Sequence, residues 1–230
     1  MMTEIKICGL KDRSALETAI DAGADLAGFV FFANSPRNLD MAQAATLSQI
    51  ARGRIRLVAL TVNADDRLID DITAIVQPDL LQLHGRESPD DAARLAARTG
   101  LGIIKAVGIS GPADLEATGD YADVCDYLLL DAKPPEQANR PGGLGEPFDW
   151  TVLEGYEPGV PWLLAGGLTP ENVAEALSIS HAPGVDVSSG VESAPGVKDP
   201  ERIRTFVAAA RRNDAAKDNK RDKTQVRTSA

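Results

Sequence analysis

Two short segments rich in glycine and serine have the residue types that bind a phosphate group. Gly166-Gly167 ends the strand-like run Trp162–Ala165, and Ser188-Ser189-Gly190 ends the run Gly184–Val187. Runs of this length are typical of buried strands, and small residues after a strand leave backbone N–H groups open to an anion. One such turn alone is weak evidence for a site. Two in succession at the end of a strand-and-helix series favour a phosphate site.

Cys8 and Asp131 each end a strand-like run and are candidates for proton transfer. A thiol near backbone N–H groups and Lys or Arg side chains can have a lowered pKa, which would make Cys8 a general base. Most free cysteines, however, are small buried hydrophobic residues. Asp131 follows three leucines, and a carboxyl group at a desolvated site can keep its proton and act as a general acid. Asp131 could instead be a helix or loop cap.

Arg37 and His84 are candidates for substrate binding. The guanidinium of Arg37 is planar and suits a carboxylate, although an arginine in a loop can also be a solvated charge. His84 could carry a proton or pack beneath the substrate, and packing is slightly favoured. Cys125 lies at a helix-to-strand turn, away from these residues, and is interpreted as structural. Taken one at a time, these residues do not define a reaction.

The elements that must position these residues are strand-like runs, eight in number, which alternate with eight helical segments. The runs are Glu4–Cys8, Asp25–Phe32, Arg56–Val62, Leu80–Leu83, Gly102–Val107, Tyr127–Leu130, Trp162–Ala165 and Gly184–Val187. This alternation is typical of parallel strands joined by helices. Eight units in 230 residues predict a single closed (β/α)8 barrel, the TIM-barrel fold. An open doubly wound sheet is the alternative, but no G-x-G-x-x-G follows the first strand.

The chain is expected to form one domain, residues 1–211, followed by a disordered tail, residues 212–230. The last helix is predicted from about Asp199 to Arg211, and the residues after it have almost no apolar content. A segment that cannot bury apolar surface does not fold by itself. Deletion of the tail should therefore leave the melting temperature unchanged.

Composition excludes several classes of function. The net charge of −10 disfavours nucleic acid as a partner. No apolar stretch is long enough to span a membrane, and no signal-peptide pattern is present, so a cytoplasmic protein is expected. Two cysteines fit a reducing compartment rather than a disulfide scaffold. The two histidines form no metal-ligand spacing, so no metal site is predicted.

Taken together, the motifs resemble the phosphoribosylanthranilate isomerase family of tryptophan biosynthesis, over residues 3 to 207. The most specific motifs are K-I-C-G at Lys6–Gly9 and V-D-V-S-S-G-V-E at Val185–Glu192. Further matches are G-F-V-F with S-P-R (Gly28–Phe31, Ser35–Arg37), V-N (Val62-Asn63), Q-L-H-G (Gln82–Gly85), K-A-V (Lys105–Val107), L-L-D (Leu129–Asp131), G-G-x-G with F-D-W (Gly142–Trp150), A-G-G-L-x-P-E-N-V (Ala165–Val173) and P-G-x-K-D (Pro195–Asp199). The resemblance implies a (β/α)8 fold and an enzyme without a cofactor.

The resemblance also implies residue roles. Cys8 matches the general base, Asp131 the general acid and Arg37 the residue that meets the anthranilate carboxylate. Gly166-Gly167 and Ser188-Ser189-Gly190 match the phosphate cradle. The reaction implied is an Amadori rearrangement of a small phosphorylated substrate, by a monomer or a homodimer. One departure is Leu144, which replaces the hydroxyl residue usual in G-G-[ST]-G of the mobile loop.

Two other interpretations remain open on the sequence. A lyase such as indole-glycerol-phosphate synthase shares the barrel and the phosphate site, but it would be expected to have a catalytic lysine on an early strand beside a glutamate. Cys8 in K-I-C-G argues against it. A barrel that binds a ligand without catalysis is also possible, although Cys8 and Asp131 at the expected positions make it less favoured.

Overall fold

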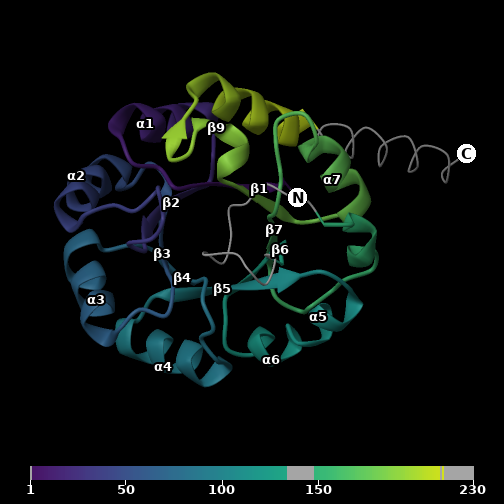
Figure 1. Cartoon of the computed structure of the whole chain (residues 1–230), viewed down its shortest axis with the longest axis horizontal. Helices are drawn as coiled ribbons and strands as arrows, with labels where there is room; N and C mark the ends of the chain where they lie inside the picture. The colour runs from purple at the N-terminus through teal and green to yellow at the C-terminus, as the bar shows by residue number, and fades with distance from the viewer. Residues whose placement is uncertain (1, 134–147, 213, 215–230) are drawn as a thin grey trace, which may run out of the picture.

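The centre of the molecule is a closed barrel of eight parallel strands (Figure 1). The structure, a computed structural model, describes residues 2–133, 148–212 and 214. The strands are β1 (Glu4–Cys8), β2 (Leu26–Phe31), β3 (Arg56–Thr61), β4 (Leu80–Leu83), β5 (Gly102–Ile109), β6 (Tyr127–Ala132), β7 (Trp162–Leu164) and β8 (Gly184–Val187). Parallel pairing of residues 4–7 with residues 184–187 joins β1 to β8 and closes the barrel. The predicted (β/α)8 fold is confirmed.

Helices surround the barrel and connect successive strands (Figure 1). They are α1 (Arg13–Ala22), α2 (Met41–Ala51), α3 (Asp66–Asp71) with the π-helical turn η1 (Ile72–Val76), α4 (Pro89–Thr99), α5 (Pro112–Glu116), α6 (Gly119–Ala122), the 3-10 turn η2 (Trp150–Leu153), α7 (Val173–Ser180) and a C-terminal helix that begins at residue 200. Side chains of Asp12, Asp40, Asp65 and Ser88 cap the first four by accepting backbone N–H groups.

The segment 112–121, which its pattern predicts as one short helix, forms two helices, α5 and α6. Thr118 lies between them. Its hydroxyl is bonded both to the carbonyl of Leu115 and to the hydroxyl of Tyr156, and the next residue is Gly119, a poor helix former. The chain after β8 also adds elements that the alternation does not predict. These are a 3-10 turn, η3 (Ser189–Val191), and an antiparallel hairpin of β9 (Glu192–Ala194) and β10 (Val197–Lys198).

The interior of the barrel is mostly apolar, with buried polar side chains on β1, β4 and β8. A buried cluster made only of strand and strand-end residues fills it, and its members are Leu26, Val58, Leu80, Ile104, Ala106, Leu129, Leu163 and Ala165. Lys6 of β1 is fully buried and donates to Asp186 of β8 at 2.8 Å. Since an isolated buried charge is costly, this ion pair makes the two charges compatible with the interior.

The C-terminal helix extends beyond the predicted boundary at residue 211. Residues 212 and 214 are helical, and the buried carboxylate of Asp214 accepts from the backbone N–H and the hydroxyl of Thr3. Arg211 donates to the carbonyl of Thr3 and to the carboxylate of Asp25. The boundary is therefore wrong by at least three residues, because Asp214 gives this helix a polar contact that apolar content does not reveal. Residue 213 and residues 215–230 of the predicted tail lie outside the described part of the chain.

Two further findings concern only the described ranges. No helix in them is long and apolar enough to cross a membrane. Within the same residues, His, Cys, Asp and Glu side chains form no group of three that could hold a metal ion.

Candidate active site

The C-terminal ends of the strands bring the candidate residues to one mouth of the barrel, since all eight strands run in the same direction. Cys8 ends β1, His84 follows β4, and Asp131 lies near the end of β6. Gly166-Gly167 follows β7, and Ser188 follows β8. Several direct contacts join these ends. The hydroxyl of Ser188, for example, donates to the carbonyl of Cys8 at 3.1 Å.

Asp131 faces His84 across the mouth. The distance from His84 Nε2 to Asp131 Oδ2 is 3.4 Å, and both side chains are largely buried. On the other side of the ring, the amide nitrogen of Gln82 lies 2.8 Å from His84 Nδ1. With the amide of Gln82 placed to donate to Nδ1, the ring would carry its proton on Nε2, toward Asp131. His84 is thus a polar neighbour of the candidate acid, whereas the sequence favoured packing, and Gln82 orients it.

Cys8 is buried between charged groups of the first and last strands. Burial raises the pKa of its thiol, the positive charges of Lys6 and Lys198 lower it, and the negative charge of Asp186 raises it further, with a raised pKa as the result. Lys6 is close: a side chain at Gly28 would lie 3.0 Å from Cys8 Sγ and 3.2 Å from Lys6 Nζ. A lowered pKa of Cys8, the expectation from the sequence, is wrong. Desolvation outweighs the neighbouring cations.

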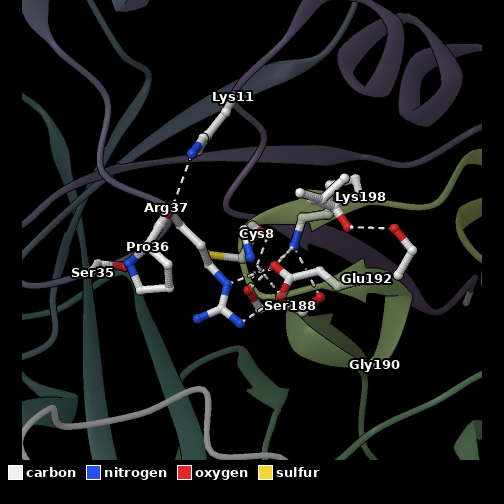
Figure 2. A network of polar contacts seen from close by, with 12 residues as sticks. Cys8, Lys11, Ser35, Pro36, Arg37, Ser188, Gly190, Glu192 and Lys198 are labelled. Carbon is white, nitrogen blue, oxygen red and sulfur yellow. Dashed lines mark hydrogen bonds and ion pairs between the residues drawn. The ribbon is translucent and has the colours of Figure 1, made fainter.

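Arg37 is held by a carboxylate of the protein itself. Its Nε and Nη2 donate to the two carboxylate oxygens of Glu192 at 2.7 and 2.8 Å, as Figure 2 shows. Only 5% of Arg37 is exposed, so it is not a solvated loop charge. A guanidinium has a second edge, Nη1 with the remaining N–H of Nη2. Among the described residues, none accepts a hydrogen bond from Nη1.

The two glycine-rich segments pack against each other after β7 and β8. A side chain at Gly190 would collide with the carbonyl of Leu168, so the two backbones are in direct contact there. Lys198 donates to the carbonyl of Ser188 at 2.9 Å and fixes this end of β8. The small residues of both segments keep bulky side chains away from their backbone N–H groups, which suits an anion.

Two other buried polar residues, Lys105 within β5 and Glu87 after β4, hold the loop around His84. Lys105 donates to the carbonyl of Gly85 and to the carboxylate of Glu87 at 2.7 and 3.0 Å. Glu87 in turn accepts the backbone N–H groups of Asn63 and Gly85. These bonds hold the segment after β4 rather than face the mouth.

Cys125 precedes β6 at the opposite end of the barrel. Burial raises the pKa of its thiol to about 11, so it stays protonated at neutral pH, as a structural residue would. Leu144 and the rest of the loop 134–147, where the sequence places a mobile segment, lie outside the described residues.

The fold and the mouth together define a (β/α)8-barrel enzyme, with a thiol and a carboxyl group on different strands of one mouth. Which enzyme follows from comparison with known proteins. The family model for N-(5'-phosphoribosyl)anthranilate (PRA) isomerase matches residues 5–209. The chain belongs to this family of isomerases, and the resemblance found in the sequence is confirmed.

Individual relatives agree over nearly the whole chain. N-(5'-phosphoribosyl)anthranilate isomerase of Rhodopseudomonas palustris (strain BisA53) is 54% identical, over 92% of this chain and 97% of the relative. The enzyme of that name from Paracoccus denitrificans is also 54% identical, over 91% and 98%. Among solved structures, phosphoribosyl anthranilate isomerase from Thermotoga maritima has a TM-score of 0.82 at 36% identity, covering 91% of this chain and 98% of that one.

Two further solved structures are informative in different ways. A phosphoribosyl anthranilate isomerase in complex with reduced 1-(o-carboxyphenylamino)-1-deoxyribulose 5-phosphate is 33% identical, with a TM-score of 0.79, over 91% of this chain and 98% of that one. Mycobacterium tuberculosis tryptophan synthase, at 16% identity and a TM-score of 0.63 over 91% and 93%, shares only the fold.

Proposed function

We propose that the chain converts N-(5'-phosphoribosyl)anthranilate into 1-(2-carboxyphenylamino)-1-deoxyribulose 5-phosphate, a step of tryptophan biosynthesis, with Asp131 as general acid and Cys8 as general base. The observation that carries the proposal is the position of these two residues on β6 and β1, at one mouth. An acid and a base on separate strands can reach opposite sides of one sugar. The names of the relatives above support the same substrate.

In the first step, Asp131 gives its proton to the furanose ring oxygen. The bond between that oxygen and C1' breaks, and the anilino nitrogen forms a protonated Schiff base with C1'. Asp131 is left as a carboxylate. His84 Nε2–H and the backbone N–H of Ala132 lie 3.4 and 2.8 Å from its two oxygens and stabilise that charge. Asp131 must carry a proton before this step. While it is protonated, the N–H groups of His84 and Ala132 cannot both donate to it as they do to the carboxylate.

In the second step, the thiolate of Cys8 removes the proton from C2'. The electron pair forms a C1'–C2' double bond and neutralises the nitrogen, which gives an enolamine that tautomerises to the ketone. Because burial raises the pKa of Cys8, the thiolate is the minor form at neutral pH. The buried ammonium group of Lys6 reduces the free energy needed to form it.

The two ends of the substrate are bound by groups that do not react. The phosphate is proposed to lie on the backbone of Gly166, Gly167 and the segment 188–190, and the anthranilate carboxylate on the free edge of Arg37. Binding at both ends orients the reacting carbons between them. His84 contacts the substrate beside Asp131, and the residues proposed here need no metal or cofactor.

The proposed setting is a cytoplasmic enzyme with a small molecule as its only partner. The acidic net charge of −10 disfavours nucleic acid. One structural relative, from Thermotoga maritima, is described as dimeric with monomers derived from it. A monomer or a homodimer is proposed for this chain as well.

An isomerase assay of the purified protein tests the proposal, with Cys8→Ser and Asp131→Asn as variants. Each should lose roughly 10²-fold or more in turnover, the usual share of a general base or acid, and bind the reduced product analogue as the wild type does. Cys125→Ser, the matched thiol control, should keep its activity. Full turnover in either catalytic variant would remove that residue from the mechanism. Indole-glycerol phosphate formation, or binding without turnover, would favour the alternative functions.

A further inference from the structure

We propose that Glu192 is a positioning residue for Arg37, which holds one edge of the guanidinium so that the other edge is presented to the carboxylate of the substrate. The inference deepens the proposed function and rests on it, because it takes Arg37 as the group that receives the anthranilate carboxylate. Glu192 itself touches no substrate in this account.

The contact between the two side chains is a buried, two-point ion pair. Arg37 Nε and Nη2 lie 2.7 and 2.8 Å from the two oxygens of Glu192, whose side chain is 4% exposed. Paired parallel N–H···O bonds of this kind fix the plane of the guanidinium as well as its position. Burial alone would raise the pKa of Glu192, but its bonds and charges with Arg37 and Lys198 outweigh burial and lower it, so the carboxylate is ionised.

The β9–β10 hairpin is shaped to place Glu192 at this point (Figure 2). The backbone N–H of Gly196, in the turn of the hairpin, donates to Glu192 Oε2 at 3.1 Å. A side chain at Gly196 would collide with the carbonyl of Pro36, so the turn lies directly against the loop that carries Arg37. Lys11 donates to that same carbonyl at 2.8 Å. The turn of the hairpin therefore contacts both Glu192 and the loop that carries Arg37.

Arg37, Lys198 and Glu192 together carry one net positive charge, which a bound anion could neutralise. Lys198, nearly fully buried, donates to Glu192 Oε1 at 2.8 Å, so one carboxylate faces two cations. The carboxylate of a substrate on the free edge of Arg37 would neutralise the remaining positive charge. An arginine with one edge already fixed also loses less side-chain freedom when it binds a ligand. The arrangement is thus suited to binding a carboxylate without reorganisation.

The test compares two ligands in a double-mutant cycle of Glu192→Gln and Arg37→Gln. The first ligand is reduced 1-(o-carboxyphenylamino)-1-deoxyribulose 5-phosphate, which carries the carboxylate, and the second is ribose 5-phosphate, which lacks it. Calorimetry should show that Glu192→Gln weakens the first ligand by about 10-fold and leaves the second within about twofold. KM should rise by a similar factor with kcat nearly unchanged. In the Arg37→Gln background, Glu192→Gln should have no further effect on the first ligand.

Equal losses for both ligands, or losses that simply add in the double variant, would show that Glu192 acts on the fold and overturn the inference. If Arg37→Gln binds the carboxylated ligand as well as the wild type does, the role of Arg37 is wrong and the inference is wrong with it. A wild type that binds the ligand but lacks isomerase activity would refute the proposed reaction alone, since the binding cycle does not depend on turnover.

A second measurement tests the inference in protein that keeps Glu192, so it does not depend on whether a Glu192 variant folds. In protein labelled with ¹⁵N-arginine, the Nε–H resonance of Arg37, assigned by its loss in Arg37→Lys, should exchange slowly with solvent in the absence of ligand. Addition of the carboxylated ligand should leave that resonance in place, since Nε stays on Glu192. Rapid exchange in the free protein would overturn the inference.

Discussion

The thiol of Cys8 has surroundings that act on its ionisation in opposite directions. Removal from water disfavours the thiolate, whereas Lys6 and Lys198 favour it. The balance matters for the proposed role of Cys8 because only the thiolate can act as a base. The charged groups around the thiol come from the two strands that close the barrel. Lys6 lies on β1 with Cys8, and Asp186 lies on β8.

A titration of the thiol tests this balance. In a Cys125→Ser background, the absorbance of the thiolate near 240 nm should show a pKa above the ordinary free-thiol value of about 8.5, because burial raises it. Removing the ion pair with Lys6→Met and Asp186→Asn together should raise the pKa further, since Lys6 has the larger effect of the two on Cys8. A pKa of Cys8 at or below the ordinary value would contradict the described burial.

That Cys8, Asp131 and His84 lie at one mouth of the barrel was predictable from the sequence, but their interactions were not. Cys8, Asp131 and His84 end apolar runs, and a closed barrel places such ends together. The pairing of Arg37 with Glu192 spans 155 positions of the chain, and nothing local in either segment encodes it. Glu192 could have been noticed because it ends the motif V-D-V-S-S-G-V-E, but the motif does not say what it contacts.

Strands and helices that follow from local apolar patterns of the sequence were predicted well. Elements whose position depends on individual polar contacts were not. The strands follow from short apolar runs, which are local signals. Helix α7 begins only at Val173, because Asn172 accepts the backbone N–H of Thr169 and holds the preceding chain in a turn. The hairpin of β9 and β10 is too short to have a period at all. Its position depends on Glu192 and Gly196, which contact a distant loop.

The connection between β5 and α5 gives a prediction of pH dependence. Asp114 accepts from the backbone N–H and the hydroxyl of Ser110 and from Lys133, just after β6. The bonds with Lys133 and Ser110 lower the pKa of Asp114 to about 2. Because the unfolded chain binds this proton at the ordinary pKa of about 3.9, the stabilisation is complete above that pH and is lost as the pH falls toward 2.

Asp114→Asn should therefore lower the free energy of unfolding near pH 6 by about 1 kcal/mol, a value typical of a partly exposed capping residue. The difference from the wild type should shrink as the pH falls from 4 toward 2. Urea unfolding at a series of pH values measures it. A difference that stays constant over that range would mean that the charge of Asp114 plays no part.

At the scale of the whole molecule, the two ends of the described chain are bonded to each other. Asp214 accepts two bonds from Thr3, at the entrance to β1, and Arg211 donates to the carbonyl of Thr3. These contacts hold the strand that carries Lys6 and Cys8. They also connect the C-terminal helix to the end of the barrel opposite the mouth.

Two truncated proteins distinguish the contribution of the Asp214–Thr3 contact to stability from that of the residues after it. Removal of residues 212–230 deletes Asp214 and leaves buried donors of Thr3 without a partner, which should lower the free energy of unfolding by about 1–3 kcal/mol. Removal of residues 216–230 keeps Asp214 and should leave the melting temperature unchanged, because that segment has little to bury. Equal stability of both truncated proteins would show that the Asp214–Thr3 contact contributes nothing.

The ion pairs across the closing strands have a consequence for the two halves of the barrel. Lys6 and Arg37 lie in the first half of the chain, and their partners Asp186 and Glu192 lie in the second. A fragment ending after β4 would contain buried cations without counter-ions, and a fragment starting at β5 would contain the matching carboxylates. Lys6 and Arg37 thus have their carboxylate partners in the other half, where Glu192 is also paired with Lys198. A half barrel alone lacks these ion pairs and is less stable for that reason. The complementary charges favour association of the two halves into one closed barrel.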